Sequence, residues 1–166
     1  MAHVSVADPV CPVLSEILFE SARELGLSVH KGGTYVCIEG PQFSTKAESM
    51  FYRSLGFDVI GMTNVPEYKL AREAEICFAT VALVTDYDVW HASEEPVTVE
   101  VVMKRMEKLI EDAKRIMKKA LPRIARARFD CGCRNALENA IVTDLKQVPK
   151  HILQRLRPII GKYLEK

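Results

Sequence analysis

The chain has 166 residues, of which 48% are hydrophobic and 27% are charged, and its 23 basic and 22 acidic residues leave a net charge of +1. This is enough material for one hydrophobic core. The near-neutral balance gives no general electrostatic reason to expect nucleic acid or an acidic membrane surface as a partner. No apolar run reaches the length of a membrane span, so we expect a cytoplasmic protein.

The first third of the chain predicts a helix and then two short strands. Apolar residues recur at helical spacing after Asp8 and stop at Gly26, which can adopt the left-handed conformation that ends a helix. Residues 27–29 and 35–38 have strand composition, and the intervening Lys31-Gly32-Gly33 favours a hairpin.

Residues 39–66 predict a loop, a helix, a strand and a second helix. Thr45 and Glu48 have the spacing of a capping box, so a helix should begin there and end at Gly56. Residues 58–61 read as a strand, and Pro66 suits the first position of the next helix. This alternation is typical of the α/β class, here a mixed sheet flanked by helices.

The longest apolar run, residues 76–84, ends in Thr85-Asp86-Tyr87-Asp88. Its β-branched residues predict a strand covered on both faces. Asp86 and Asp88 should then project together from the carboxyl end of that strand, which is where open α/β sheets bind ligands. A polar loop that caps a buried strand is the alternative.

The last third of the chain is expected to be helical. Apolar residues from Val99 to Leu121 follow a helical period, and residues 149–164 predict a further helix interrupted by Pro158. Basic residues cluster at 104–128 without interleaved aromatic residues, which favours a solvated helix face over a nucleic-acid site.

Five cysteines at irregular spacing argue against a secreted disulfide framework. Cys131-Gly-Cys133 lacks a second cysteine pair or histidine nearby in sequence, so a structural zinc site is not expected. Free thiols are the simplest interpretation. If the protein comes from a hyperthermophile, Cys11 with Cys77 and Cys131 with Cys133 are the disulfide pairs to test.

Three segments in order, 39–44 (Glu-Gly-Pro-Gln-Phe-Ser), 61–67 (Gly-Met-Thr-Asn-Val-Pro-Glu) and 85–88 (Thr-Asp-Tyr-Asp), resemble the signature loops of a known family. That family is the trimeric purine nucleoside phosphorylase superfamily, specifically its 5′-methylthioadenosine phosphorylase branch. The resemblance implies the C-terminal half of a phosphorylase/hydrolase-like three-layer domain over residues 1–122, followed by a helical tail over 123–166. It also implies phosphorolysis of a purine nucleoside, with inorganic phosphate as co-substrate and no metal or organic cofactor.

The resemblance assigns roles to most of the loop residues. Asp86 would protonate N7 of the departing purine, a step that needs a carboxyl group whose pKa is raised by a dry pocket. Asp88 would be a second contact to a 6-aminopurine. Phe43 would stack on the base and Met62 would pack under the ribose.

The remaining assignments concern specificity, phosphate and assembly. Ser44 replaces the acidic residue that 6-oxopurine enzymes use, and Thr63 resembles the phosphate-binding threonine. An apolar pocket for a 5′-methylthio group would be lined by Val99, Val102 and Met103. His3 resembles a histidine that closes this pocket from a neighbouring subunit, which implies a homotrimer or a hexamer.

The resemblance also indicates a gap, because the family's Gly-rich phosphate loop and Arg-His pair have no counterpart in this sequence. We therefore expect the chain to be a fragment that is active only with the phosphate-binding half. Two alternatives stay open. The chain can belong to a broader purine nucleoside phosphorylase that accepts adenosine or inosine, or it can be a non-catalytic nucleoside-binding or oligomerising remnant. A metal site at Asp86 and Asp88 lacks a third hard ligand nearby in sequence.

Overall fold

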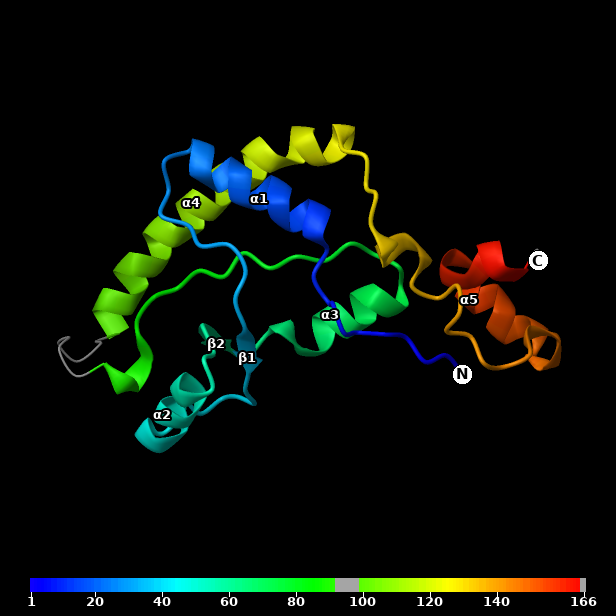
Figure 1. Ribbon diagram of the computed structural model, residues 1–166, viewed down its shortest axis with the longest axis horizontal. Coiled ribbons are helices and arrows are strands. Elements are labelled where there is room, and N and C mark those ends of the chain that lie inside the picture. Colours follow the sequence, from blue (N-terminus) through cyan, green and yellow to red (C-terminus); the bar gives the residue numbers. More distant parts are fainter. Residues whose placement is uncertain (92–98, 165–166) are drawn as a thin grey trace. The chain divides into compact units, whose positions relative to one another are not determined.

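The computed structural model describes residues 1–91 and 99–164, and the side chains of Val99, Val101 and Val102 also lie outside the described part. Helices and short parallel strands alternate along the chain (Figure 1), so the predicted α/β class is confirmed. The chain divides into two compact units. Unit 1 comprises Met1–Leu14, Pro66–Ala79 and Phe129–Lys166, and unit 2 comprises Ser15–Val65 and Thr80–Arg128.

The first helix, α1 (Pro12–Glu24), starts at a proline, which suits the first helical position because its missing N–H would have no partner there. Gly26 follows with φ of 70°, the left-handed stop that the sequence predicted. Leu18 and Ala22 form the buried face of the helix. The predicted helix is confirmed, although it begins three residues after Pro9.

The predicted capping box is present at the start of α2 (Lys46–Ser54). The Thr45 hydroxyl accepts from the Glu48 N–H at 3.2 Å, and the Glu48 carboxylate accepts from the Thr45 N–H at 2.7 Å. The Thr45 N–H and, more weakly, the Thr45 hydroxyl, which donates to the same carboxylate at 2.8 Å, lower the pKa of Glu48. At the other end, Gly56 has φ of 75°, so both predicted boundaries of this helix are confirmed.

The sheet of unit 2 consists of β1 (Tyr35–Cys37) and β2 (Val59–Gly61), which pair in parallel with Tyr35 opposite Val59. The predicted hairpin between residues 27–29 and 35–38 is therefore wrong. Residues 27–29 are not part of a strand, and β1 instead finds its partner 24 residues along the chain. The Thr34 carbonyl, which accepts from Asp58 N at 2.9 Å, helps to fix this pairing.

The predicted buried strand over residues 76–84 is also wrong, because these residues have no strand partner within the described part of the chain. Ile76 and Val84 are 59% and 60% exposed. An apolar composition favours a strand only where a neighbouring strand can complete its hydrogen bonds and cover its faces. Here the segment runs in an irregular conformation to a short 3₁₀ helix, η1 (Asp88–Trp90).

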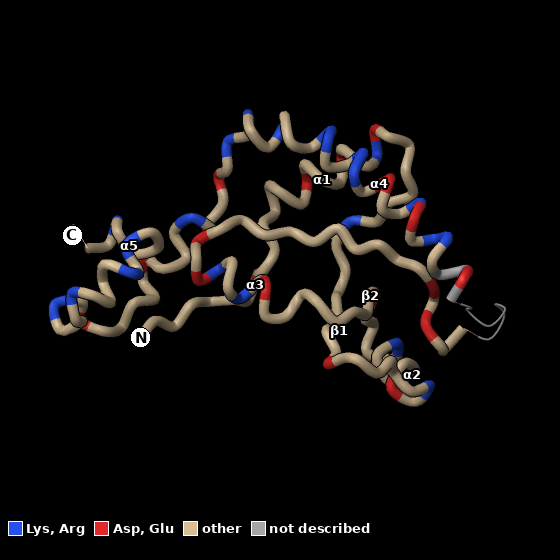
Figure 2. Tube along the Cα trace, turned by 180° about the vertical axis from the view of Figure 1, so that it is seen from behind, with Lys and Arg blue, Asp and Glu red and all other residues tan. Residues whose placement is uncertain are grey.

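The longest helix, α4 (Val99–Arg126), confirms the helical period predicted from Val99 onward and continues past Leu121. In Figures 1 and 2 it lies beside α1, and Glu24 in α1 pairs with Lys119 at 2.9 Å and with Arg123 at 2.7 Å. These cations lower the pKa of Glu24 to about 2. Lys and Arg residues follow α4 along its length in Figure 2, and most are exposed, as expected for a solvated helix face.

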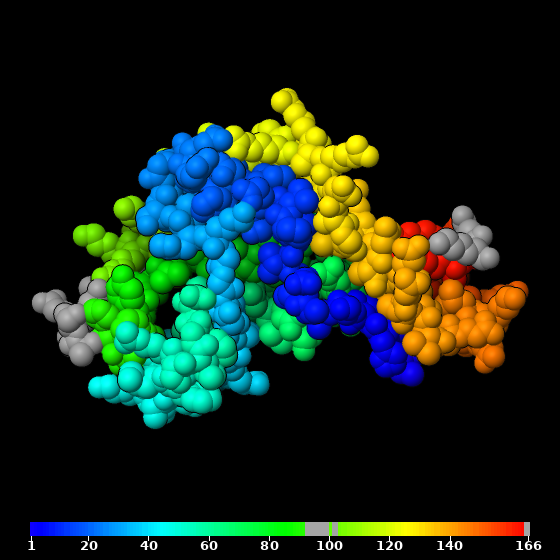
Figure 3. Space-filling model, viewed as in Figure 1, coloured from blue at the N-terminus to red at the C-terminus, as the bar shows by residue number. Residues whose placement is uncertain are grey.

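Unit 1 brings the N-terminal segment against the C-terminal part of the chain (Figure 3). Ala2 forms an antiparallel bridge with Ile141, and His3 N donates to the Ala140 carbonyl at 2.8 Å. The buried core of this unit includes Leu137, Ala140 and Ile160. The last of these belongs to α5 (Lys150–Leu164), which confirms the final predicted helix, although the predicted interruption is wrong because the helix continues through Pro158.

A carboxylate with several donors fixes α5 in unit 1. Glu75 follows α3 (Asn64–Glu73), and its side chain is 7% exposed. Its oxygens accept from Lys162 Nζ at 2.8 Å, Tyr163 OH at 2.6 Å and Leu137 N at 2.9 Å. Burial opposes the charge, but these donors outweigh it and hold the pKa of Glu75 below its ordinary value. Two 3₁₀ turns, η2 (Gly132–Asn135) and η3 (Leu145–Gln147), precede α5.

Among the helices that the structure describes, none combines the length and the apolar character needed to cross a bilayer.

Candidate functional site

Two of the three motif loops meet at one edge of the sheet in unit 2. Because β1 and β2 are parallel, their carboxyl ends share that edge, and each is followed directly by a motif. The hydrogen bonding between the two strands extends one residue past β1, where Ile38 N donates to the Gly61 carbonyl at 2.9 Å. A Cβ at Gly40 would lie 2.8 Å from the Met62 sulfur, so the Met62 side chain packs closely against the first loop.

The first loop presents one exposed ring and one buried hydroxyl. Phe43 is 84% exposed, which leaves an apolar face available for contact. The Ser44 hydroxyl is buried and has no hydrogen-bond partner among the residues described. A buried polar group without a partner costs about 1–3 kcal/mol, so this oxygen is a ready acceptor or donor for a ligand. Thr45 and the capping box of α2 fix the loop immediately after it.

The third motif has a geometry that differs from the predicted one. Asp86 and Asp88 do not end a strand, and Asp88 has φ of 58°. The rule that residues two apart in a strand point to the same side therefore does not apply to them. Instead the Asp88 N–H donates to Asp86 Oδ1 at 2.9 Å, and the Thr85 hydroxyl donates to Asp86 Oδ2 at 2.7 Å. The half-buried Asp86 carboxylate is thus held in a defined orientation, with Asp88 also half-buried beside it.

Two arginines attach the third motif to neighbouring helices of unit 2. The Arg105 guanidinium, from α4, donates to the Thr85 carbonyl at 2.7 Å. Arg53, from α2, lies over the Trp90 ring at 3.7 Å from its centroid. Sequence reasoning missed both arginines and Trp90, because cation–π and backbone contacts between distant segments leave no local pattern.

Aromatic rings also gather at the third motif. His91 stacks on Tyr87, with ring centroids 5.0 Å apart and an interplanar angle of 25°. Trp90 meets His91 edge to face, also at 5.0 Å. Such ring contacts orient the turn that carries the two aspartates.

The predicted phosphate residue, Thr63, is exposed and stands just before α3. Val65 interrupts the start of that helix with extended dihedrals (φ −103°, ψ 128°), so the first turn is irregular. The neighbouring Asn64 is engaged, since its Oδ1 accepts from the Thr80 hydroxyl at 2.8 Å. The arrangement of helix N–H groups expected beside the Thr63 hydroxyl is therefore incomplete in this structure.

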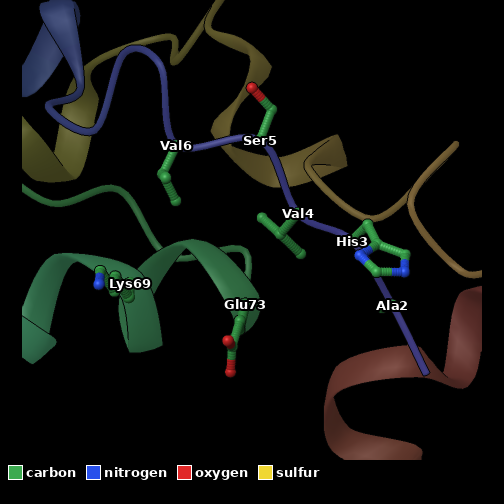
Figure 4. Close-up of a pocket in the computed structure, with 7 residues that line it drawn as sticks. All are labelled: Ala2, His3, Val4, Ser5, Val6, Lys69 and Glu73. Atoms are coloured by element: carbon green, nitrogen blue, oxygen red, sulfur yellow. The ribbon is translucent and has the colours of Figure 1, made fainter.

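The predicted 5′ pocket is described only in part. The side chains of Val99 and Val102 lie outside the described residues, and Met103 is 57% exposed. His3 belongs to unit 1, where it is one of the residues that line an open hollow of about 470 Å³. Figure 4 shows this hollow between the extended segment 2–6 and Lys69 and Glu73 of α3.

Four thiols gather elsewhere in unit 1. The Sγ atoms of Cys11, Cys77, Cys131 and Cys133 all lie within 4.8 Å of one another, and no disulfide joins them. Burial raises the pKa of the Cys133 thiol to about 11. Burial acts the same way on Cys131, but hydrogen bonds from Cys133 and the nearby thiols bring its pKa below its ordinary value. Sequence spacing alone missed this cluster because it did not show that Cys11 and Cys77 approach Cys131-Gly-Cys133.

Comparison with known families identifies the class of protein to which these loops belong. A family model described as the phosphorylase superfamily matches residues 1–122, and the chain belongs to that family.

Curated relatives resemble the chain over almost its whole length. It is 51% identical over 164 residues to the S-methyl-5′-thioadenosine phosphorylase of Geobacter sulfurreducens, a match that covers 99% of this chain and 57% of the relative. It is also 51% identical over 142 residues to the protein of the same name from Thermofilum pendens, covering 86% and 53%. The chain thus spans little more than half the length of these relatives.

Two solved structures of methylthioadenosine phosphorylases are also similar to this chain, again over little more than half of their own length. A methylthioadenosine phosphorylase from an antarctic soil metagenomic library superimposes with a TM-score of 0.87 at 43% identity, covering 95% of this chain and 56% of the other. The methylthioadenosine phosphorylase of Schistosoma mansoni in complex with adenine superimposes with a TM-score of 0.71 at 32% identity, covering 78% and 51%.

Proposed function

We propose that this chain forms the base- and sugar-binding part of a phosphorylase that converts 5′-methylthioadenosine and inorganic phosphate into adenine and 5-methylthioribose 1-phosphate. The observation that carries the proposal is the meeting of the first two motif loops at one edge of the parallel pair, where Met62 packs on Gly40. The relatives of the same name at 51% identity support the choice of substrate.

In the proposed reaction, a phosphate oxygen forms a bond to C1′ of the ribose while the bond from C1′ to N9 of the purine breaks. The bonding electrons move onto the base, and Asp86 in its protonated form delivers a proton to N7. Two local donors, the Thr85 hydroxyl and the Asp88 N–H, support this assignment because they hold the Asp86 side chain in one orientation. Asp88 would be the second contact to the exocyclic amine of adenine.

Substrate binding would use the exposed and unpaired groups of unit 2. The Phe43 ring would stack on the purine, and the buried Ser44 hydroxyl would gain a hydrogen-bond partner from the base. Met62 would pack under the ribose. Inorganic phosphate is the co-substrate, with the Thr63 hydroxyl as one of its ligands, and the proposal requires no metal or organic cofactor.

Specificity for a 5′-methylthio group would come from Val99, Val102 and Met103, with His3 supplied by a neighbouring subunit of a trimer or hexamer. The proposed domain limits are residues 1–122 for the phosphorylase part and 123–166 for a helical tail. We expect the assembled enzyme to act in the cytoplasm.

The experiment that tests the proposal joins this chain to the portion of the Geobacter sulfurreducens relative that it does not cover. Phosphate-dependent release of adenine from 5′-methylthioadenosine should exceed release of hypoxanthine from inosine, and the intact relative is the control for assay conditions. A preference for inosine would overturn the choice of substrate. Calorimetric binding of adenine by the chain, with no phosphate-dependent turnover in the chimera, would favour a non-catalytic nucleoside-binding protein.

A further inference from the structure

The cysteine cluster of unit 1 is the strongest chemical feature outside the proposed substrate site. Its four members come from all three segments of the unit: Cys11 from Met1–Leu14, Cys77 from Pro66–Ala79, and Cys131 and Cys133 from Phe129–Lys166. Cysteines are commonly buried singly as small apolar residues. Convergence of four thiols from three separate segments needs a further explanation.

The spacing of the sulfurs fits a single tetrahedral ion. Cys131 Sγ lies 3.7 Å from Cys11 Sγ and 3.6 Å from Cys77 Sγ. A tetrahedral zinc centre with Zn–S bonds of about 2.3 Å places its sulfurs about 3.8 Å apart. Because all four sulfurs lie within 4.8 Å of one another, small side-chain adjustments are enough to surround one ion.

The four cysteines of the cluster differ in their exposure to solvent. Cys11 is 0% exposed and Cys133 is 4% exposed, whereas Cys77 and Cys131 are half-buried. A metal could therefore enter past the latter pair and then be shielded by the former.

A backbone donor points at one of the sulfurs. Leu14 N, in the first turn of α1, lies 3.5 Å from Cys11 Sγ. Donors of this kind offset the negative charge that thiolates carry when they bind a metal, and they fix the orientation of the ligands.

We propose that Cys11, Cys77, Cys131 and Cys133 bind one Zn²⁺ ion in a tetrahedral site that joins the three segments of unit 1. Four thiolates select a soft or borderline cation and disfavour Mg²⁺ and Ca²⁺, which take oxygen ligands. The site is structural, because four protein ligands leave no open position for substrate or water. This inference is independent of the proposed phosphorylase activity, since none of the four residues belongs to the three motif loops.

The test measures zinc in the chain after expression in zinc-supplemented medium and purification without chelators. We expect one zinc per chain by mass spectrometry of metals. Cys77→Ser should lower the retained zinc at least about tenfold, because the remaining three thiolates cannot close the tetrahedron. Cys37→Ser is the matched control and should keep one zinc, since Cys37 is a half-buried free thiol in β1 of unit 2, outside the cluster.

A second measurement keeps the proposal testable if Cys77→Ser does not fold. The unmodified chain loaded with Co²⁺ should show sulfur-to-metal charge-transfer bands and the intense d–d bands of tetrahedral thiolate coordination. Absence of zinc together with absence of these bands overturns the proposal. So does a thiol titration of the denatured, chelator-treated and unreduced chain that finds fewer than five free thiols, because the cysteines are then joined in disulfides.

Discussion

In unit 1 the carboxylate of Glu75 is surrounded by three donors, whereas in unit 2 the buried hydroxyl of Ser44 has no partner among the described residues. One apolar side chain from each unit shows the same difference. Leu137 is 4% exposed in unit 1, but Phe43 is 84% exposed in the first motif loop of unit 2. Unit 1 satisfies its groups with its own contacts, and the motif loops of unit 2 keep groups available for a ligand. Substitutions in the core of unit 1 should therefore reduce stability, and substitutions in the motif loops of unit 2 should reduce binding.

The largest effect on stability is expected for Leu137→Ala. This side chain belongs to the core of unit 1 with Ala140 and Ile160, so its truncation leaves a cavity and should cost about 2–5 kcal/mol of unfolding free energy. Phe43→Ala is the control, because an exposed ring contributes little to folding. Urea unfolding followed by circular dichroism measures both variants, and equal losses would remove the distinction between the two units.

A smaller loss is expected for Glu75→Gln. The substitution keeps the size of the side chain but leaves Lys162 without its counter-charge, and weakened hydrogen bonds at this nearly buried position should cost about 1–3 kcal/mol. The matched control is Glu111→Gln in α4, whose pair with Lys114 is exposed on both sides. If both variants lose the same stability, the Glu75 contacts are no stronger than a surface ion pair.

The pH dependence of stability should follow from the same carboxylate. The folded pKa of Glu75 is lowered from its ordinary value of 4.5, so its contribution is present above that pH and is lost as pH falls through the lowered value. Urea midpoints measured from roughly pH 6 to pH 3 should fall less steeply for Glu75→Gln than for the unmodified chain. Parallel profiles would show that other carboxylates account for the acid sensitivity.

The smallest effect is expected for Thr45→Ala, which removes the cap of α2 and should cost about 1 kcal/mol. Thr45→Ser retains the hydroxyl and should be nearly neutral. A loss of the same size in both variants would mean that the methyl group, and not the capping hydrogen bond, stabilises the helix. The comparison is made by thermal unfolding.

Features with local causes could be predicted from the sequence. The capping box of Thr45 and Glu48 and the left-handed stops at Gly26 and Gly56 each depend on a few neighbouring residues, and all are present. The long amphipathic helix α4 has enough turns for its period to be unambiguous.

Features that depend on partners from distant sequence could not be predicted in the same way. Residues 76–84 have strand composition but no strand beside them in the described structure. Asp88 adopts a positive φ, so the strand geometry that would make Asp86 and Asp88 project together is not present. The thiol cluster joins Cys11 to Cys131 across 120 residues. Spacing along the chain shows none of these contacts, although the motif loops themselves were recognisable from their residues.

The central claim is that Asp86 recognises and protonates a 6-aminopurine, and one substitution tests it most directly. In the chimera, Asp86→Asn should lower kcat/KM for 5′-methylthioadenosine by about 100-fold or more, because general acid catalysis typically contributes that much. The loss with inosine should be much smaller, since an asparagine amide can donate to the 6-oxo group. Equal losses with both nucleosides, without a change in thermal stability, would contradict the assignment.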